Sequence, residues 1–157
     1  MQRPFVSRLW LFLVFSLAAN HPAVLAAEQA LESEQAFELS AALQDAGTVR
    51  LSWNIADGYY LYRQKFKFVS LTAGIKTSDP VFPVGQLKQD HHFGTVELYR
   101  NDLEVKLPIA RQQGAQSKTL TLEVTFQGCA DAGICYMPTQ KVISFELPDL
   151  TVRMSPS

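Results

Sequence analysis

The chain has 157 residues, with 14 basic and 15 acidic side chains and a formal net charge of −1. It has no block of like charges, which argues against nucleic acid or an anionic membrane surface as its partner. Once an N-terminal export segment is set aside, the length suffices for one domain with a hydrophobic core and is too short for two.

The N-terminus has the pattern of a secretory signal peptide. Arg3 and Arg8 flank the start of an almost unbroken apolar run at residues 9–19, and small residues follow at Ala26 and Ala27. This pattern predicts that residues 1–26 are cleaved off and that the mature protein is soluble and periplasmic. The run is short for a bilayer core, which needs about 20 residues, although an uncleaved membrane anchor is the alternative.

Alternation of apolar and polar residues predicts β-strands throughout the mature chain. The clearest case is residues 49–55, where Val49, Leu51, Trp53 and Ile55 alternate with polar residues and predict one buried face. Turn residues separate such runs, and no segment of helical length shows a 3.6-residue period. In chain order, the expected strands lie at residues 37–43, 49–55, 59–71, 96–99, 103–109, 120–126 and 143–147.

These strands predict an all-β fold. Their number and spacing favour an immunoglobulin-like antiparallel β-sandwich over residues 27–150, with a small barrel as the alternative. The polar residues 151–157 are expected to form a disordered tail. Within residues 65–71 the alternation changes phase, because Phe66 and Phe68 share one parity and Val69 and Leu71 the other. We expect a β-bulge there.

The segment 127–138 lies between two expected strands and therefore connects a hairpin. It contains Cys129 and Cys135, the two cysteines of the chain, which we expect to pair in an oxidising compartment. A bond across so short a loop stabilises a fold less than one across a long loop, and weakly stabilising disulfides are candidates for redox switches. An ordinary hairpin disulfide that stiffens the loop is the alternative.

A metal site is a third possibility. It would use the two cysteines together with His91 and His92. Known structural zinc sites use more closely spaced cysteine pairs, and adjacent histidines are common in surface loops. We therefore predict no metal and no other cofactor.

The chain resembles the N-terminal periplasmic domain of the thiol:disulfide interchange protein DsbD family. The resemblance extends from about residue 35 to about residue 147. The matching positions are Trp53, Asp57-Gly-Tyr-Tyr-Leu-Tyr-Arg63, Gly94, Glu97-Leu-Tyr-Arg100 and Gln127-Gly-Cys-Ala-Asp-Ala-Gly-Ile-Cys-Tyr136.

The resemblance implies a monomeric protein-disulfide reductase with a redox-active cysteine pair on an immunoglobulin-like domain. Such domains accept electrons from a membrane transporter domain and pass them to periplasmic thioredoxin-fold proteins, namely a disulfide isomerase and a protein of cytochrome c maturation. Cys135 would attack the partner's disulfide and Cys129 would resolve the mixed disulfide. Tyr60 and Tyr62 would line the site; without the resemblance they are ordinary half-buried strand aromatics.

Two departures from the family pattern stand out. The family's cap loop carries a phenylalanine that covers the disulfide, and this sequence has His92 at that position, followed by Phe93. Either Phe93 takes over the shielding or the cap is more polar. The family's membrane region and C-terminal thioredoxin-like domain are absent from the sequence, so we expect a free-standing version or a fragment, with another protein as electron donor.

The residues around the cysteines suit a reductant. No cationic residue lies between Gln127 and Gln140, and Asp131 would disfavour a thiolate. Tyr136, followed by Met137 and Pro138, offers an apolar contact for a partner. The alternative from another functional class is a secreted β-sandwich binding or chaperone module with a structural disulfide.

Overall fold

The computed structural model describes residues 30–90 and 93–148. Within these ranges the chain forms eleven β-strands, one short α-helix and one 3-10 helix. Their bounds are α1 Ser33–Ala36, β1 Phe37–Asp45, β2 Thr48–Ile55, β3 Tyr59–Tyr62, η1 Arg63–Lys65, β4 Lys67–Ser70, β5 Ile75–Thr77, β6 Gln86–Asp90, β7 Gly94–Tyr99, β8 Asp102–Arg111, β9 Thr119–Phe126, β10 Gly128–Ala130 and β11 Thr139–Glu146.

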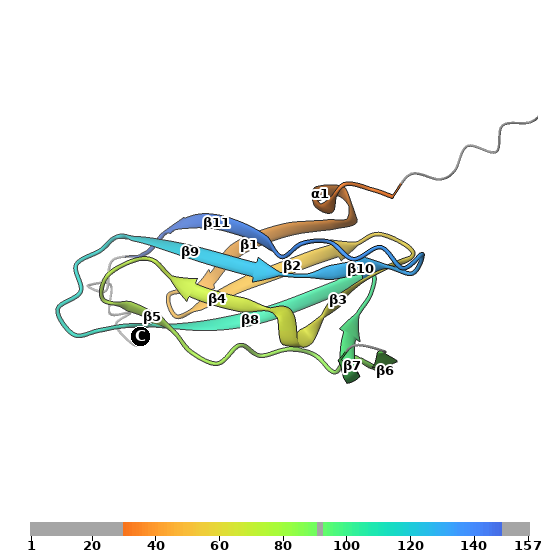
Figure 1. Cartoon of the computed structure of the whole chain (residues 1–157). Helices are drawn as coiled ribbons and strands as arrows, with labels where there is room; N and C mark the ends of the chain where they lie inside the picture. The colour runs from red at the N-terminus through yellow and green to blue at the C-terminus, as the bar shows by residue number, and fades with distance from the viewer. Residues whose placement is uncertain (1–29, 91–92, 149–157) are drawn as a thin grey trace, which may run out of the picture.

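The strands form three groups of hydrogen-bonded neighbours. One has the order β1-β2-β8-β5, the second β11-β9-β4 and the third β10-β3-β7-β6, and the pairings between these strands are antiparallel. In Figure 1 the β11-β9-β4 group lies in front of β1, β2 and β8, and β10, β6 and β7 lie toward one end. This is the all-β sandwich that the sequence predicts, and its two main sheets remain open rather than closing into a barrel.

The core lies between the two main sheets. In β2, Val49, Leu51, Trp53 and Ile55 are buried while Arg50 is exposed, as the alternation predicts. The facing strand β9 buries every second residue in the same way. Two sheets that each bury one face against the other explain why period-two alternation is so clear in these strands.

The segment 59–71 is not one strand with a bulge. After β3 the helix η1 moves the chain from the β10-β3-β7-β6 sheet to the β11-β9-β4 sheet. Strand β4 then pairs with β9 in continuous register, from Lys67 opposite Thr125 to Ser70 opposite Leu122. The predicted bulge is therefore wrong. Phe66 and Phe68 pack against the main core, whereas the Leu71 side chain is exposed, so the change of phase reflects an apolar residue outside the core.

A second, smaller core lies at the end of the sandwich. It consists of Tyr60, Tyr62, Val96, Leu98 and Cys129, contributed by β3, β7 and β10. This cluster positions one of the two cysteines among buried aromatic and aliphatic side chains.

The expected signal peptide 1–26 and the expected tail 151–157 lie outside the described residues. Within the described part of the chain, no helix has the length and apolar character needed to cross a bilayer.

Candidate redox site

The two cysteines form a disulfide inside the β9–β11 hairpin. Cys129 lies in β10 and Cys135 on the returning strand, directly opposite, with a Cα–Cα distance of 4.0 Å. A backbone hydrogen bond flanks the pair on each side: Tyr136 N–H donates to the Gly128 carbonyl at 3.0 Å, and Ala130 N–H to the Ile134 carbonyl at 2.7 Å. Backbone hydrogen bonds therefore lie on both sides of the disulfide.

The two halves of the disulfide differ in exposure. Cys129 is 1% exposed, whereas Cys135 lies at the surface. Two exposed apolar side chains flank Cys135, Ile134 at 48% and Met137 at 83% exposure. An incoming protein can therefore reach Cys135 and find apolar contact surface beside it, while Cys129 is reachable from within the domain.

Gly128 allows β10 to lie against β3. A Cβ atom at this position would collide with the carbonyl oxygen of Tyr60 and with the ring of Phe37. Any other residue would push β10 away from β3, with which it pairs through Gly128–Leu61 and Cys129–Tyr60. The glycine before the first cysteine is thus required by close packing.

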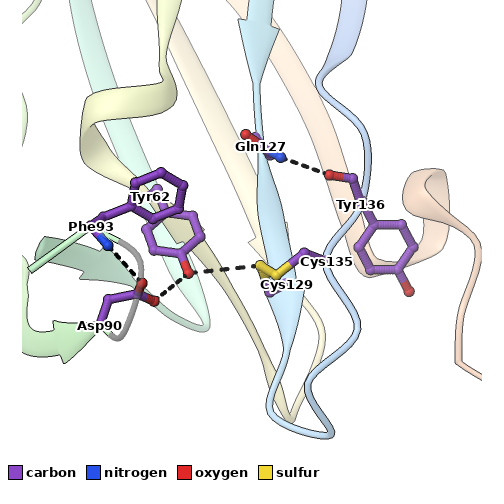
Figure 2. Close-up of a disulfide and its surroundings, with 7 residues drawn as sticks. All are labelled: Tyr62, Asp90, Phe93, Gln127, Cys129, Cys135 and Tyr136. Atoms are coloured by element: carbon purple, nitrogen blue, oxygen red, sulfur yellow. Dashed lines mark hydrogen bonds between the residues drawn. A yellow bond between two sulfur atoms is a disulfide. The ribbon is translucent and has the colours of Figure 1, made fainter.

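Tyr62 connects the buried cysteine to a carboxylate. Its hydroxyl lies 3.8 Å from Sγ of Cys129 and donates a hydrogen bond of 2.9 Å to Oδ2 of Asp90 (Figure 2). Burial first, and then hydrogen bonds with Tyr60 and Asp90, raise the pKa of Tyr62 well above its usual value. The hydroxyl is therefore protonated at any physiological pH and serves as a neutral polar group beside the sulfur.

Phe93 packs over Tyr62 from the cap loop. Its ring centroid is 5.8 Å from that of Tyr62, and its main-chain N–H donates to Oδ1 of Asp90 at 3.1 Å. The side chain is 52% exposed. Figure 2 shows Phe93 beside Tyr62, on the side of that ring away from Cys135. His91 and His92, and with them the alternative of His92 as the shield of the disulfide, lie outside the described residues.

Tyr60 contacts two cations, Lys88 of β6 and Arg100 from the turn between β7 and β8. Nζ of Lys88 lies 4.7 Å and the Arg100 guanidinium carbon 4.9 Å from its ring centroid, both within the range of cation–π attraction. A third cation, Lys65, lies 4.4 Å from the ring centroid of Phe93. The fold therefore surrounds the aromatic residues of the site with positive charge that the local sequence of the cysteine loop lacks.

The negative charge of Asp131 is paired with Arg100, a cation that the sequence did not place at the site. Its two carboxylate oxygens accept hydrogen bonds of 2.9 and 2.7 Å from the Arg100 guanidinium. The hydrogen bond from Arg100 is the main reason that the pKa of Asp131 is lowered. Arg100 also donates to the Tyr59 carbonyl at 3.3 Å. The expectation that Asp131 opposes a thiolate therefore needs correction, because its charge is paired.

Tyr136 turns away from the sulfurs. Its ring packs edge-on against Phe37 at 5.4 Å between centroids, and Figure 2 shows it on the side of the loop that faces α1. Its carbonyl accepts a hydrogen bond of 2.9 Å from the Gln127 side chain. Tyr136 thus holds the chain that follows Cys135, whereas Met137 offers the exposed apolar surface expected of this segment.

Among the described residues, no group of three His, Cys, Asp or Glu side chains is arranged to hold a metal ion. In the oxidised state the sulfurs of Cys129 and Cys135 are bonded to each other, so neither is a thiolate ligand. The two histidines of the alternative zinc site lie outside the described residues.

The family model for the N-terminal domain of thiol:disulfide interchange protein DsbD matches residues 27–147. The chain belongs to the DsbD N-terminal domain family. The DsbD of Klebsiella pneumoniae is 46% identical over 100 residues, which cover 64% of this chain and 16% of that protein. The DsbD of Pseudomonas fluorescens is 37% identical over 138 residues, covering 88% of this chain and 22% of that protein. The chain therefore spans about a fifth of the length of such relatives.

Solved structures show the same fold. The reduced DsbD N-terminal domain of Neisseria meningitidis matches with a TM-score of 0.66 and 34% identity, over 74% of this chain and 89% of that one. A complex between the DsbD N-terminal and PilB N-terminal domains of the same species matches with a TM-score of 0.62 and 32% identity, over 73% and 85% of the two chains. The immunoglobulin-like sandwich inferred from the strand pattern is confirmed.

Proposed function

We propose that this chain is a periplasmic thiol–disulfide oxidoreductase domain. It acts as a protein-disulfide reductase that relays reducing equivalents from a membrane electron-transporter domain to thioredoxin-fold proteins. The observation that carries the proposal is the unequal exposure of the disulfide, with Cys135 open to a partner and Cys129 buried. Membership of the DsbD family favours this function over a binding or chaperone module with a structural disulfide.

The exchange takes place in two steps. In the reduced domain, the Cys135 thiolate attacks one sulfur of the acceptor's disulfide, forming a mixed disulfide and releasing the acceptor's other sulfur as a thiolate. The Cys129 thiolate then attacks Sγ of Cys135 and releases the acceptor's remaining sulfur. Two electrons pass to the acceptor, whose thiolates take up protons, and the domain is left with the Cys129–Cys135 disulfide. A donor dithiol restores the reduced domain by the same chemistry.

The second step requires a proton to leave a buried thiol. In the reduced state Cys129 S–H can donate to the Tyr62 hydroxyl oxygen, whose own hydrogen is directed to Asp90. The carboxylate of Asp90 is the base at the end of this path, and it accepts the Tyr62 proton as the hydroxyl takes the one from sulfur. Deprotonation of Cys129 therefore need not await entry of water into the small core.

A protein, rather than a small molecule, is the partner that the surface suits. The apolar side chains Ile134 and Met137 lie beside the accessible cysteine, and small transient interfaces of this kind serve encounters between redox proteins. The complex formed by the neisserial DsbD N-terminal domain supports a protein domain as partner. We propose that the acceptors are a disulfide isomerase and a thioredoxin-like protein of cytochrome c maturation, and that the domain is monomeric.

Equilibration with glutathione tests the proposal. The purified protein is incubated with defined ratios of reduced and oxidised glutathione, and the fraction of dithiol is measured by trapping free thiols. An exchange protein has a reduction potential above about −300 mV, whereas a structural disulfide lies below that value. A potential in the structural range would overturn the proposal. The Cys129→Ser/Cys135→Ser double variant gives the background of the assay.

A further inference from the structure

A short segment before the first strand is hydrogen-bonded to the β9–β11 hairpin, which carries the two cysteines. We call residues 31–36, which include α1, the N-terminal strap. The main-chain N–H of Leu31 donates to the Tyr59 hydroxyl at 2.8 Å, and the Leu31 carbonyl accepts a hydrogen bond from the Tyr136 hydroxyl. One strap residue therefore bridges two tyrosines from distant parts of the chain, and the second of these tyrosines directly follows Cys135.

The strap makes two more contacts with the strand that leaves the hairpin. Oγ of Ser33 lies 2.7 Å from Oγ1 of Thr139, and the Glu34 carboxylate lies 2.9 Å from Nζ of Lys141. These contacts span more than 100 positions in sequence, so they tie the N-terminal end of the domain to β11. The ion pair is exposed and contributes little, whereas the hydroxyl contact is partly buried.

Tyr136 is the residue through which the strap reaches the site. Its main-chain N–H donates a hydrogen bond to the Gly128 carbonyl, and its own carbonyl accepts one from the Gln127 side chain. Its ring packs on Phe37, and its hydroxyl donates a hydrogen bond to the Leu31 carbonyl of the strap. Three of these contacts come from the hairpin and β1. The fourth comes from the strap, which limits how far the chain after Cys135 can move.

We propose that the N-terminal strap sets the redox equilibrium of the cysteine pair, with Tyr136 as the positioning residue that transmits its effect to Cys135. The inference rests on the proposed exchange function. When the disulfide is reduced, the position of Cys135 relative to Cys129 depends on the noncovalent contacts around it. By restricting the chain after Cys135, the strap keeps the two thiols close together and raises their effective concentration for closing the disulfide.

The direction of the effect follows from the freedom of the reduced loop. In the oxidised state the disulfide already restricts the loop, so loss of the strap gains little freedom there. In the reduced state the same loss releases the chain after Cys135 and stabilises the dithiol. Weakening the strap therefore shifts the equilibrium with glutathione toward the dithiol. A strap that merely supported the fold would lower the stability of both states equally and leave this equilibrium unchanged.

The test compares single hydroxyl deletions. Tyr136→Phe keeps the ring on Phe37 and removes the bond to the strap. Tyr99→Phe is the matched control, because the Tyr99 hydroxyl likewise donates to a backbone carbonyl, that of Pro83, at 3.0 Å. The measured quantity is the equilibrium constant with glutathione, together with the thermal midpoints of both redox states. A neutral hydrogen bond makes a modest net contribution, so we expect a shift of about threefold toward the dithiol in Tyr136→Phe and none in Tyr99→Phe.

A second variant acts from the strap itself. Leu31→Pro removes the N–H that donates to Tyr59 and leaves every side chain of the hairpin intact. It should shift the equilibrium in the same direction as Tyr136→Phe. An unchanged equilibrium constant in both variants, or an equal shift in Tyr99→Phe, would overturn the inference while leaving the proposed function in place. A parent protein that stays oxidised in excess reduced glutathione would contradict the proposed function instead.

Discussion

The hydroxyl of Tyr62 lies 3.8 Å from Sγ of Cys129. Both groups are buried, since Tyr62 is 3% and Cys129 1% exposed. In the second step of the proposed exchange, a protonated, neutral hydroxyl would therefore lie beside the sulfur that must lose a proton. The role of this contact can be tested separately from the packing of the ring.

Tyr62→Phe should slow resolution of the mixed disulfide by about tenfold or more, because the Cys129 proton loses its acceptor. The reduced domain is mixed with oxidised thioredoxin, a model thioredoxin-fold substrate, in a stopped-flow instrument. The measured quantity is the rate at which reduced thioredoxin is released. Tyr99→Phe serves again as the control for loss of a partly buried hydroxyl. Equal rates of product release in the parent and Tyr62→Phe would remove Tyr62 from the mechanism.

The division of labour between the cysteines predicts opposite outcomes for two serine variants. Cys129→Ser keeps the exposed attacking thiol and loses resolution, so a covalent complex with oxidised thioredoxin should accumulate. Cys135→Ser should form no such complex, because its remaining thiol is buried. A non-reducing gel after mixing shows the result. If only Cys135→Ser formed the covalent complex, Cys129 would be the attacking cysteine and Cys135 the resolving one.

The positive charges at Lys65 and Lys88 should favour the thiolate of the reduced site. Reversing both, in Lys65→Glu/Lys88→Glu, should lower the rate of alkylation by iodoacetamide about threefold at pH 7 and low salt, with a smaller effect at high salt. The matched control is Lys76→Glu/Lys106→Glu, which reverses two exposed charges on β5 and β8. The same decrease in the control would show a nonspecific effect of net charge.

Because Gly128 is closely packed, adding a methyl group there should destabilise the domain. Gly128→Ala should lower the free energy of unfolding by about 1–3 kcal/mol, because the side chain overlaps the backbone of β3 and the ring of Phe37. In Gly47→Ala, by contrast, the new Cβ would meet only ordinary contacts, at 3.7 and 3.8 Å. Urea unfolding of both variants gives the comparison. A Gly128→Ala variant as stable as Gly47→Ala would mean that β10 moves aside without cost.

The Arg100–Asp131 pair predicts a pH-dependent contribution to stability. Arg100 lowers the folded pKa of Asp131 below the ordinary value of 3.8, so the contribution is full at neutral pH and is lost as the pH falls through that lowered pKa. Asp131→Asn should therefore be less stable than the parent at pH 7, by under about 1 kcal/mol because the pair is exposed. The difference should shrink as the pH falls through that lowered pKa.

Urea midpoints at several pH values measure this contribution. Asp79→Asn, which alters an exposed carboxylate in the connection between β5 and β6, is the control and should match the parent at every pH. A difference between parent and Asp131→Asn that stays constant as the pH falls would point to packing rather than charge.

The main sandwich could be predicted because its strands alternate strongly. In β2 and β9 every second side chain is buried, and in residues 49–55 the alternation of apolar and polar residues predicts this burial. Strands β5 and β10 have three residues each, too few for a period to show, and β6 exposes most of its side chains. Such strands exist because neighbouring strands pair with them, and pairing leaves no local signal in one sequence.

The site was predictable where its residues adjoin the cysteines or fall in the family motifs. Tyr60 and Tyr62 were identified in this way, and both lie in the small core with Cys129. The partners of these residues come from elsewhere: Asp90 reaches Tyr62, and Lys88 reaches Tyr60, across sheet pairings. Because such contacts depend on register between strands, sequence spacing could not have indicated them.

Within the described part of the chain, the small core around Cys129 and the hydrophobic core between the two main sheets have no residue in common. The side chains that keep the domain folded and those that surround the chemistry are therefore largely different sets. The sandwich can accumulate substitutions at Val49, Leu122 or Phe145 under selection for stability alone, while the rim around the disulfide changes under selection for a new partner. Such a division allows the surface around the disulfide to be altered for a different partner without changing the core that folds the domain.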